Sequence, residues 1–279
     1  MNTTTFDPDQ LPSCPDELDL LAELVPLQQQ AIIELGCGNA RLARDLLLRF
    51  PACRVTGLEV DAVQQAKNIA RPQAGLSLVS AGAEAVPFPD ASFDLALMLK
   101  SLHHVPMPAM DLALKEIARV LRPGGFLYVS EPIYGGALNE IVRLFNDEGV
   151  VRPAAQAALD RALAGGSHWE AVTERRFSQP VSYIDFDDFS QRMLYPSFAD
   201  HGINDAIVAR VGAAFEPHVG PGGASFVRPM HVRLLRRKGL GAAAVRRFNV
   251  PVRGACQPVT ATWSSSTSRS SCSLRPDAP

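Results

Sequence analysis

The sequence predicts an α/β protein built on a doubly wound, mostly parallel sheet. Apolar segments of strand length alternate with amphipathic segments of helix length from about residue 31 to residue 130. The chain has 279 residues, of which 47% are hydrophobic, and this is enough to bury one large core. Parallel strands need crossover connections, and the helices in those connections cover both faces of the sheet.

The alternating elements can be assigned in chain order. The segment 16–25 predicts a short amphipathic helix, because Leu18, Leu21 and Leu24 share one face. The expected strands are the buried apolar runs at 31–35, 53–59, 76–81, 93–99 and 126–130. The expected helices between them cover 41–50, 61–70 and 108–121, with Asp61 as the N-cap of the second. Such a sheet binds its ligand beyond the carboxyl ends of its strands.

The pattern changes after the fifth strand. We expect 1–132 to form the core and 133–199 to form a mostly helical insertion, or cap. Residues 200–238 are expected to close the core with a helix at 205–215 and a long strand at 225–236, which pairs with 215–219. Most aromatic side chains of the insertion are expected in its own core; they are Trp169, Phe177, Tyr183, Phe186, Phe189 and Tyr195.

The last segment, 239–279, has no apolar periodicity. It contains one acidic residue and five arginines, and it has few large apolar side chains. Such a composition does not offset the entropy lost on folding. The sequence therefore predicts a disordered tail, or else an altered C-terminus.

Charge and composition argue against several function classes. Charged residues make up 20% of the chain and the net charge is −2, so neither nucleic acid nor a membrane is an expected partner. The basic run 233–238 is interpreted as a solvated strand end. The segment 1–9 lacks the basic and apolar regions of a secretory signal, so a cytoplasmic location is expected. The five cysteines show no metal-ligand spacing, and no metal site is expected.

A turn with two glycines, Glu34-Leu35-Gly36-Cys37-Gly38, follows the first expected strand. Glycines at these positions let the backbone approach a ligand closely before the next helix begins. A dinucleotide-binding fingerprint would need a third glycine at position 41, which is Arg41. This difference disfavours an oxidoreductase that uses a nicotinamide or flavin dinucleotide.

Glu59 stands at the tip of the second expected strand. A carboxylate at this place accepts hydrogen bonds from the hydroxyls of an unphosphorylated ribose. The alternative interpretation is an acid that caps the following helix, and Asp61 is better placed for that role.

Four segments taken together resemble the successive motifs of class I S-adenosylmethionine-dependent methyltransferases, and within them the small-molecule, type 11-like subgroup. The segments are 32–40, 55–61, 81–94 and 119–125. They occur in the family's order and at ordinary spacing. The resemblance implies a Rossmann-like sheet of seven strands with an antiparallel last strand, and S-adenosylmethionine as the cofactor.

The resemblance also implies roles at the methionine and ribose end of the cofactor. Glu34 would face the ammonium group of the methionine part. The backbone at Gly36 and Gly38 would line the methionine and the ribose, and Glu59 would hold the ribose. Lys100, just past the fourth strand, would contact the methionine end through its backbone.

The adenine end has its own implied residues. Val60 would pack on the adenine ring, while Ala83 and Glu84 would meet its edge. The chain departs from the family at Gly82, where the family often has aspartate. Adenine recognition is therefore expected to rely on backbone N–H groups at this point.

His104 and Glu131 are the candidate catalytic residues. His104 follows the fourth strand and Glu131 ends the fifth, so both are expected at the cofactor end of the sheet. A histidine there orients an acceptor or takes its proton, and the alternative is a structural role. His103 is expected to be structural, and Tyr134 is a further candidate on the acceptor side.

The predicted function is methyl transfer from S-adenosylmethionine to an unidentified small-molecule acceptor by in-line displacement. The sulfonium is already a strong methyl donor, so positioning the acceptor and excluding water are the main requirements. The alternative is a non-catalytic S-adenosylmethionine-binding sensor or partner subunit, which keeps the cofactor site and has lost the acceptor pocket.

Overall fold

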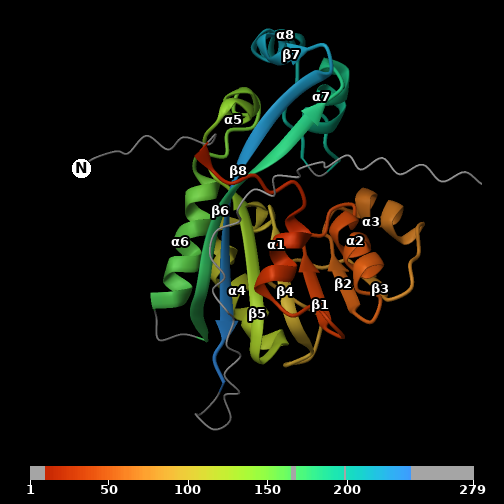
Figure 1. The fold of residues 1–279 in the computed structure, drawn as a ribbon, viewed down its shortest axis with the longest axis vertical. Coiled ribbons are helices and arrows are strands. Elements are labelled where there is room, and N and C mark those ends of the chain that lie inside the picture. The colour runs from red at the N-terminus through yellow and green to blue at the C-terminus, as the bar shows by residue number, and fades with distance from the viewer. Residues whose placement is uncertain (1–9, 165–167, 198, 240–279) are drawn as a thin grey trace, which may run out of the picture. The chain divides into compact units, whose positions relative to one another are not determined.

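The computed structural model describes residues 10–164, 168–197 and 199–239, which lie in one compact unit, Met1–Gly241. A sheet runs through this unit in the order β3-β2-β1-β4-β5-β8-β6 (Figure 1). Its strands are β1 (Ala31–Leu35), β2 (Arg54–Leu58), β3 (Leu76–Val79), β4 (Phe93–Leu99), β5 (Leu121–Pro132), β6 (Trp169–Tyr183), β7 (Val219–Gly220) and β8 (Gly223–Arg237). Strands β1 to β5 are parallel, whereas β8 lies antiparallel between β5 and β6. The two-residue strand β7 pairs with β8 outside this path.

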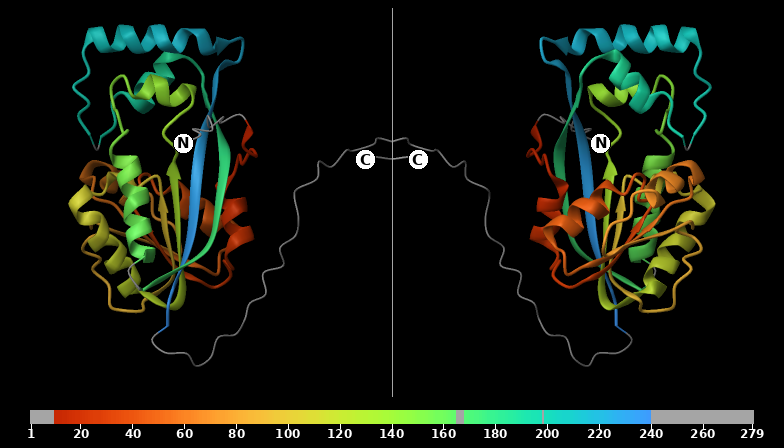
Figure 2. Two further views of the ribbon diagram at one scale, coloured as in Figure 1. Left: turned by 90° about the vertical axis from the view of Figure 1, so that its left-hand side faces the viewer. Right: turned by 90° about the vertical axis from the view of Figure 1, so that its right-hand side faces the viewer.

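Helices cover both faces of the sheet, which confirms the doubly wound α/β class (Figure 2). One face packs against α1 (Glu17–Leu24) and α2 (Arg41–Arg49), the other against α4 (Met110–Val120) and α6 (Val151–Ala164). Successive side chains of a strand point to opposite faces of the sheet, so they pack in different cores. Ile32 packs in the core on the side of α1 and α2, and Ile33 packs in the core on the side of α4 and α6. Helix α3 (Ala62–Ile69) begins at Asp61, whose side chain accepts from the Val63 N–H at 2.9 Å, as expected of its N-cap.

A third apolar core forms beyond the end of β5. It contains α5 (Ala137–Val142), α7 (Phe186–Met193), α8 (Asp205–Phe215) and the outer ends of β6 and β8. Figure 2 shows β6 and β8 running past the other strands to carry these helices. The rings of Tyr183 and Phe189 pack edge to face there, with centroids 5.0 Å apart. We call this part of the molecule the cap.

Several expectations for the second half of the chain are wrong. Residues 169–183 form the sixth strand of the sheet, although 133–199 was expected to be mostly helical. Helix α6, expected in the cap, packs on the sheet, and α8, expected to close the core, packs in the cap. Of the segment 215–219, only Val219 lies in a strand, β7, which pairs with β8 as expected; α8 and a 3-10 turn occupy the segment up to residue 218.

The physical reason for the missed strand lies in its position. β6 is the last strand of the sheet, so its outward side chains face water, and many of them are charged. A register shift between Ala171 and Thr173 also breaks the alternation of apolar and polar residues.

The expected tail, 239–279, lies outside the described residues except for Gly239. Across the described ranges, no helix combines the length and the apolar character needed to cross a bilayer.

Candidate functional site

The glycine turn after β1 has the backbone geometry expected of a ligand-binding turn. Gly36 has a φ of +73°, and a Cβ there would lie 2.8 Å from the Cβ of Ser101, so only glycine fits. Gly38 has a φ of +52°, and a Cβ there would meet nothing within 4 Å. The backbone at Gly38 therefore borders open space that a ligand can approach closely.

Glu59 ties this turn to the end of β2. Its carboxylate accepts from the N–H of Gly38 at 2.7 Å and from those of Val60 and Asp61 at 2.9 Å each. Asn68 of α3 donates from its side-chain amide to the carbonyl of Gly38 at 2.7 Å. Three of the roughly four acceptor positions of the Glu59 carboxylate are thus occupied, which leaves one for a ligand.

Glu34 lies beside the turn and is only 4% exposed. Burial raises its pKa to about 8, and its Oε2 has no hydrogen-bond partner among the described residues. The residue borders a cavity of about 240 Å³, also lined by Gly36, Gly38, Lys100 and Gln179. We call this the glycine-turn cavity. A cation bound here would supply the partner that Glu34 lacks.

The residues implied for the adenine end lie outside the lining of this cavity, at the loops after β2 and β3. Val60 is 72% exposed, and it presents an open apolar side chain. Ala83 is buried, while Glu84 is partly exposed. The carboxylate oxygens of Glu84 lie 2.5 Å from the point where a Cβ of residue 82 would stand. Glu84 therefore places a carboxylate beside Gly82, where the resembled family often has an aspartate, and the expected recognition through backbone groups stays a prediction.

A second cavity, of about 170 Å³, opens between the sheet edge and the cap, and we call it the cap cavity. Its apolar lining comes from Ile133, Leu138, Val142, Phe145, Met193 and Val227. Its ionisable lining comes from Lys100, His103, His104, Glu148, Arg152, Arg192, His201 and Arg228. Lys100 lines both cavities, so the two adjoin each other at the end of β4.

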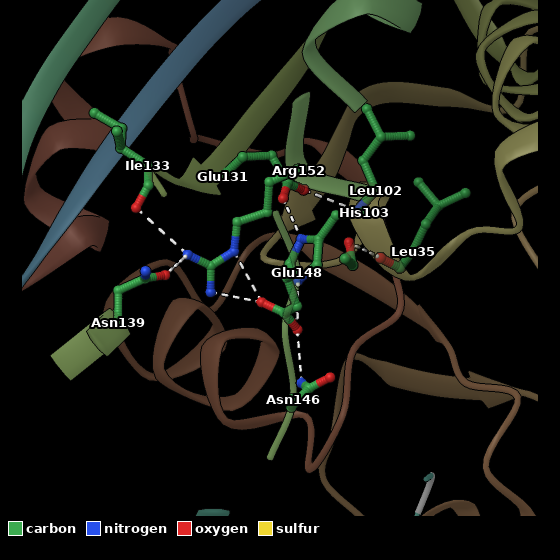
Figure 3. A network of polar contacts seen from close by, with 10 residues as sticks. Leu35, Leu102, His103, Glu131, Ile133, Asn139, Asn146, Glu148 and Arg152 are labelled. Carbon is green, nitrogen blue, oxygen red and sulfur yellow. Dashed lines mark hydrogen bonds and ion pairs between the residues drawn. The ribbon is translucent and has the colours of Figure 1, made fainter. Parts of the chain in front are cut away.

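His103 lies between two carboxylates in the wall of the cap cavity (Figure 3). Its Nδ1 hydrogen-bonds to Glu131, and its Nε2 lies 3.7 Å from Oε1 of Glu148. Glu131 is 1% exposed, and it also accepts from the N–H of Leu102 at 2.8 Å. Glu131 therefore lies outside the cavity and reaches it only through His103, which the sequence had suggested to be structural.

Glu148 is fixed in place by two neighbours. The Nε of Arg152 donates to its Oε2 at 2.8 Å, and Asn146 donates to its Oε1 at 3.0 Å (Figure 3). Arg152 in turn donates to Asn139 of α5 at 2.9 Å. These contacts connect the start of α6 to the cap.

His104 is open to the cap cavity, with its ring centroid 4.1 Å from that of His103. Desolvation by the surrounding protein, followed by the effect of His103, lowers the pKa of His104 to about 4, so the ring is neutral near pH 7. His103, His104 and Glu148 place ligand atoms within 4.8 Å of one another, a spacing suited to a metal ion. Because Arg152 already pairs with Glu148, the absence of a metal site remains our prediction.

Some candidates do not reach either cavity, and some site residues were missed. The hydroxyl of Tyr134 donates to Asp147 at 2.8 Å outside both cavities. Sequence reasoning missed Asn68, Glu148 and Arg228. Only Arg228 carries a local signal, because it is a charge inside the otherwise apolar run 226–230.

The fold and the two cavities define a doubly wound α/β protein with a ligand site at the carboxyl edge of its sheet. Residues 33–129 match the family described as a methyltransferase domain. Residues 33–129 therefore carry a methyltransferase domain, and this is the part of the chain that resembles class I S-adenosylmethionine-dependent methyltransferases.

Two curated relatives illustrate the likeness. The fatty-acid O-methyltransferase of Mycolicibacterium smegmatis is 39% identical over 106 residues, which are 37% of each chain. The phthiotriol/phenolphthiotriol dimycocerosates methyltransferase 1 of Mycobacterium ulcerans is 33% identical over 176 residues, 61% of this chain and 56% of that one. The chain thus matches only about half, or less, of these relatives' length.

A solved structure shows the same fold. The YcgJ protein from Bacillus subtilis superposes with a TM-score of 0.55 at 17% identity, over 80% of this chain and 98% of that one.

The family's cofactor, S-adenosylmethionine, fits the residues present. The unpartnered oxygen of Glu34 suits an ammonium group, and the open space at Gly38 allows close approach of a ligand. The free acceptor position on Glu59 suits a ribose hydroxyl.

Proposed function

We propose that the protein transfers a methyl group from S-adenosylmethionine, held at the glycine-turn cavity, to a small-molecule acceptor in the cap cavity. The observation that carries the proposal is the adjacency of the two cavities, which share Lys100. Methyl transfer needs the acceptor atom close to the donor and in line with it, and adjoining cavities allow this.

The cofactor supplies an activated methyl group on its sulfonium. Glu34 accepts from the ammonium group of the methionine part, and Lys100 lies beside it at the end of β4. The backbone at Gly36 and Gly38 lines the methionine and the ribose. Glu59 accepts from a ribose hydroxyl through its one remaining acceptor position.

At the adenine end, the exposed side chain of Val60 covers one face of the ring. Ala83 and Glu84 meet the edge of the ring. The Glu84 carboxylate accepts from the exocyclic amino group, since it lies beside Gly82.

The acceptor lies against the apolar lining of the cap cavity, which excludes water from it. Positioning of this kind is worth roughly 7–11 kcal/mol. For a protic acceptor, His103 takes the proton through Nε2, and Glu131 positions the ring through Nδ1. His104, the base expected from the sequence, lies beside it at the cavity mouth and orients the acceptor.

The acceptor cavity favours catalysis over cofactor binding alone, because a sensor or partner subunit needs no such cavity. One curated relative is named as a fatty-acid O-methyltransferase, which is consistent with an apolar acceptor. A cytoplasmic location and the absence of nucleic acid as a partner stay predictions.

The test is an acceptor screen with S-adenosylmethionine labelled in its methyl group. Purified protein is incubated with apolar acids, phenols and amines, and methylated products are identified by mass spectrometry. Transfer to at least one acceptor, lost in Glu34→Gln, is expected. A protein that binds S-adenosylhomocysteine but methylates nothing in the panel would be a cofactor-binding protein without transferase activity.

A further inference from the structure

We propose that the acceptor is an organic anion with an apolar body, and that Arg228 of β8 binds its carboxylate in the cap cavity. This inference rests on the proposed function, since it assigns a chemical class to the acceptor. It comes from the charge of the cavity wall and from the contacts of each basic side chain in it.

Arg228 is half-buried, and its guanidinium lacks a partner among the described residues. It lies on β8 opposite Gln179 of β6, just beyond the point where β8 stops pairing with β5. It lines the cap cavity, and within the described residues its guanidinium has no hydrogen bond or ion pair. Burial lowers its pKa, so the surroundings disfavour the charge in the absence of a ligand. An unpaired charge of this kind is costly unless a ligand anion compensates it.

The other two arginines of the cavity are already neutralised. Arg152 pairs with Glu148. Arg192 pairs with Asp188 at 3.0 Å, donates to a backbone carbonyl, and lies over the ring of Tyr183 at 4.4 Å. Among the arginines that line this cavity in the described part of the chain, Arg228 is therefore the one that can pair with a ligand.

A second polar atom in the same cavity also lacks a partner. The Nδ1 of His201 is buried without a hydrogen bond in the described part of the chain, and its residue lines the cavity. An imidazole N–H can donate to a carboxylate, as a guanidinium does. Lys100 is the remaining unpaired cation, but it also borders the glycine-turn cavity beside Glu34, where the cofactor's own charged groups lie.

The balance of charge decides between an anion and a cation as the occupant. Four basic side chains line the cavity, and Glu148 is the acidic one among its described lining residues. A carboxylate next to a guanidinium forms two parallel charge-assisted hydrogen bonds. The apolar lining from α5, α7 and β8 then covers the uncharged body of the molecule.

The experiment compares three ligands of one chain length that differ in charge and polar group: octanoate, octanamide and 1-octanol. Each is titrated calorimetrically into the protein, with and without saturating S-adenosylhomocysteine. We expect octanoate to bind at least about tenfold more tightly than octanamide. Equal affinity for octanoate and octanamide in both states would overturn the proposal.

Variants assign the preference to one side chain. Arg228→Gln should lower the affinity for octanoate by about 10- to 100-fold and leave that for octanamide unchanged. Arg228→Lys keeps the charge without the planar fork, and its loss should be smaller. Arg54→Gln removes one exposed positive charge at the start of β2, which lies four strands from β8 in the sheet, and should change nothing. A preference for octanoate that persists in Arg228→Gln would contradict the assignment.

Two further measurements separate this inference from the proposed function. Thermal melting and the affinity for S-adenosylhomocysteine report whether Arg228→Gln is folded. If it is not folded, the affinity of Arg228→Lys for octanoate tests the assignment instead. Failure of S-adenosylhomocysteine to bind would remove the methyltransferase function, while the octanoate preference of the cofactor-free protein still decides the role of Arg228.

Discussion

The imidazole of His103 hydrogen-bonds through Nδ1 to Glu131, a carboxylate that is almost fully buried and lies outside the cap cavity. A ring held in this way is fixed in one orientation, with Nε2 3.7 Å from Oε1 of Glu148 in the cavity wall. We therefore propose His103 as the proton acceptor and Glu131 as a positioning residue.

Glu131→Gln is expected to lower kcat on a protic acceptor by about 10²- to 10⁴-fold. The glutamine oxygen can keep the bond from Leu102, while its amide nitrogen would donate to Nδ1 and leave the proton on Nε2. Steady-state kinetics and a pH profile check this, with the affinity for S-adenosylhomocysteine unchanged. Wild-type kcat in the variant would mean that His103 only supports the structure.

Glu34 should make cofactor binding depend on pH. Its pKa of about 8 in the free protein means that the carboxyl is protonated at pH 7, whereas an ammonium ligand needs the carboxylate. Binding therefore releases a proton, and the affinity for S-adenosylhomocysteine should rise by up to about tenfold per pH unit between pH 6 and 8. Calorimetry in buffers of different ionisation enthalpy measures the released proton. An affinity that does not change over this range would contradict the role of Glu34.

The same residue should affect stability in the opposite direction. The folded-state pKa lies above the ordinary glutamate value of 4.5, so between these values the folded protein holds a proton that the unfolded chain has lost. The free energy of unfolding of the cofactor-free protein should therefore fall as the pH rises through this window, by at most about 1.4 kcal/mol per unit. Glu34→Gln should remove this slope in a melting series. A slope that persists in the variant would assign it to other groups.

The two glycines of the turn should respond differently to alanine. Gly38→Ala places a methyl group in open space, so it should cost only about 1–2 kcal/mol of stability and weaken cofactor binding by at least about tenfold. Gly36→Ala clashes with Ser101 and should destabilise the fold more, by about 2–3 kcal/mol. Melting curves and S-adenosylhomocysteine titrations separate the two effects. A Gly38→Ala protein with normal affinity would exclude close approach of the cofactor at this turn.

Glu84 should select adenine over hypoxanthine. Its carboxylate replaces the side chain that is missing at Gly82, and it accepts from an exocyclic amino group. Wild-type protein should therefore bind S-adenosylhomocysteine about tenfold more tightly than the inosine analogue. Glu84→Gln should reduce this ratio, and Glu140→Gln in α5 is the matched control for the loss of a carboxylate. An unchanged ratio would place Glu84 outside the adenine site.

The sequence predicted the first half of the fold well, because each element there carries its own local pattern. The strand at 31–35 has the expected bounds, and in the second half of the chain so does the helix at 205–215. The strand β6 was missed because a register shift and outward charges hide its alternation. The grouping of helices also failed, since which core α6 or α8 joins depends on contacts between residues far apart in the chain.

The candidate cofactor residues Glu34, Gly38 and Glu59 follow strand ends, and the resemblance to the methyltransferase motifs points to them; their roles stay predictions. The residues that line the cap cavity follow no comparable order along the sequence. Glu148 and Arg228 come from segments separated by 80 residues and meet only through the fold.

We propose that the glycine turn and Glu34 bind S-adenosylmethionine. Calorimetric titration with S-adenosylhomocysteine, with NAD as a control, tests it most directly. We predict micromolar binding of S-adenosylhomocysteine, none of NAD, and a severe loss of affinity in Glu59→Ala. A folded protein that does not bind S-adenosylhomocysteine, or a Glu59→Ala variant with near-normal affinity, would contradict this account.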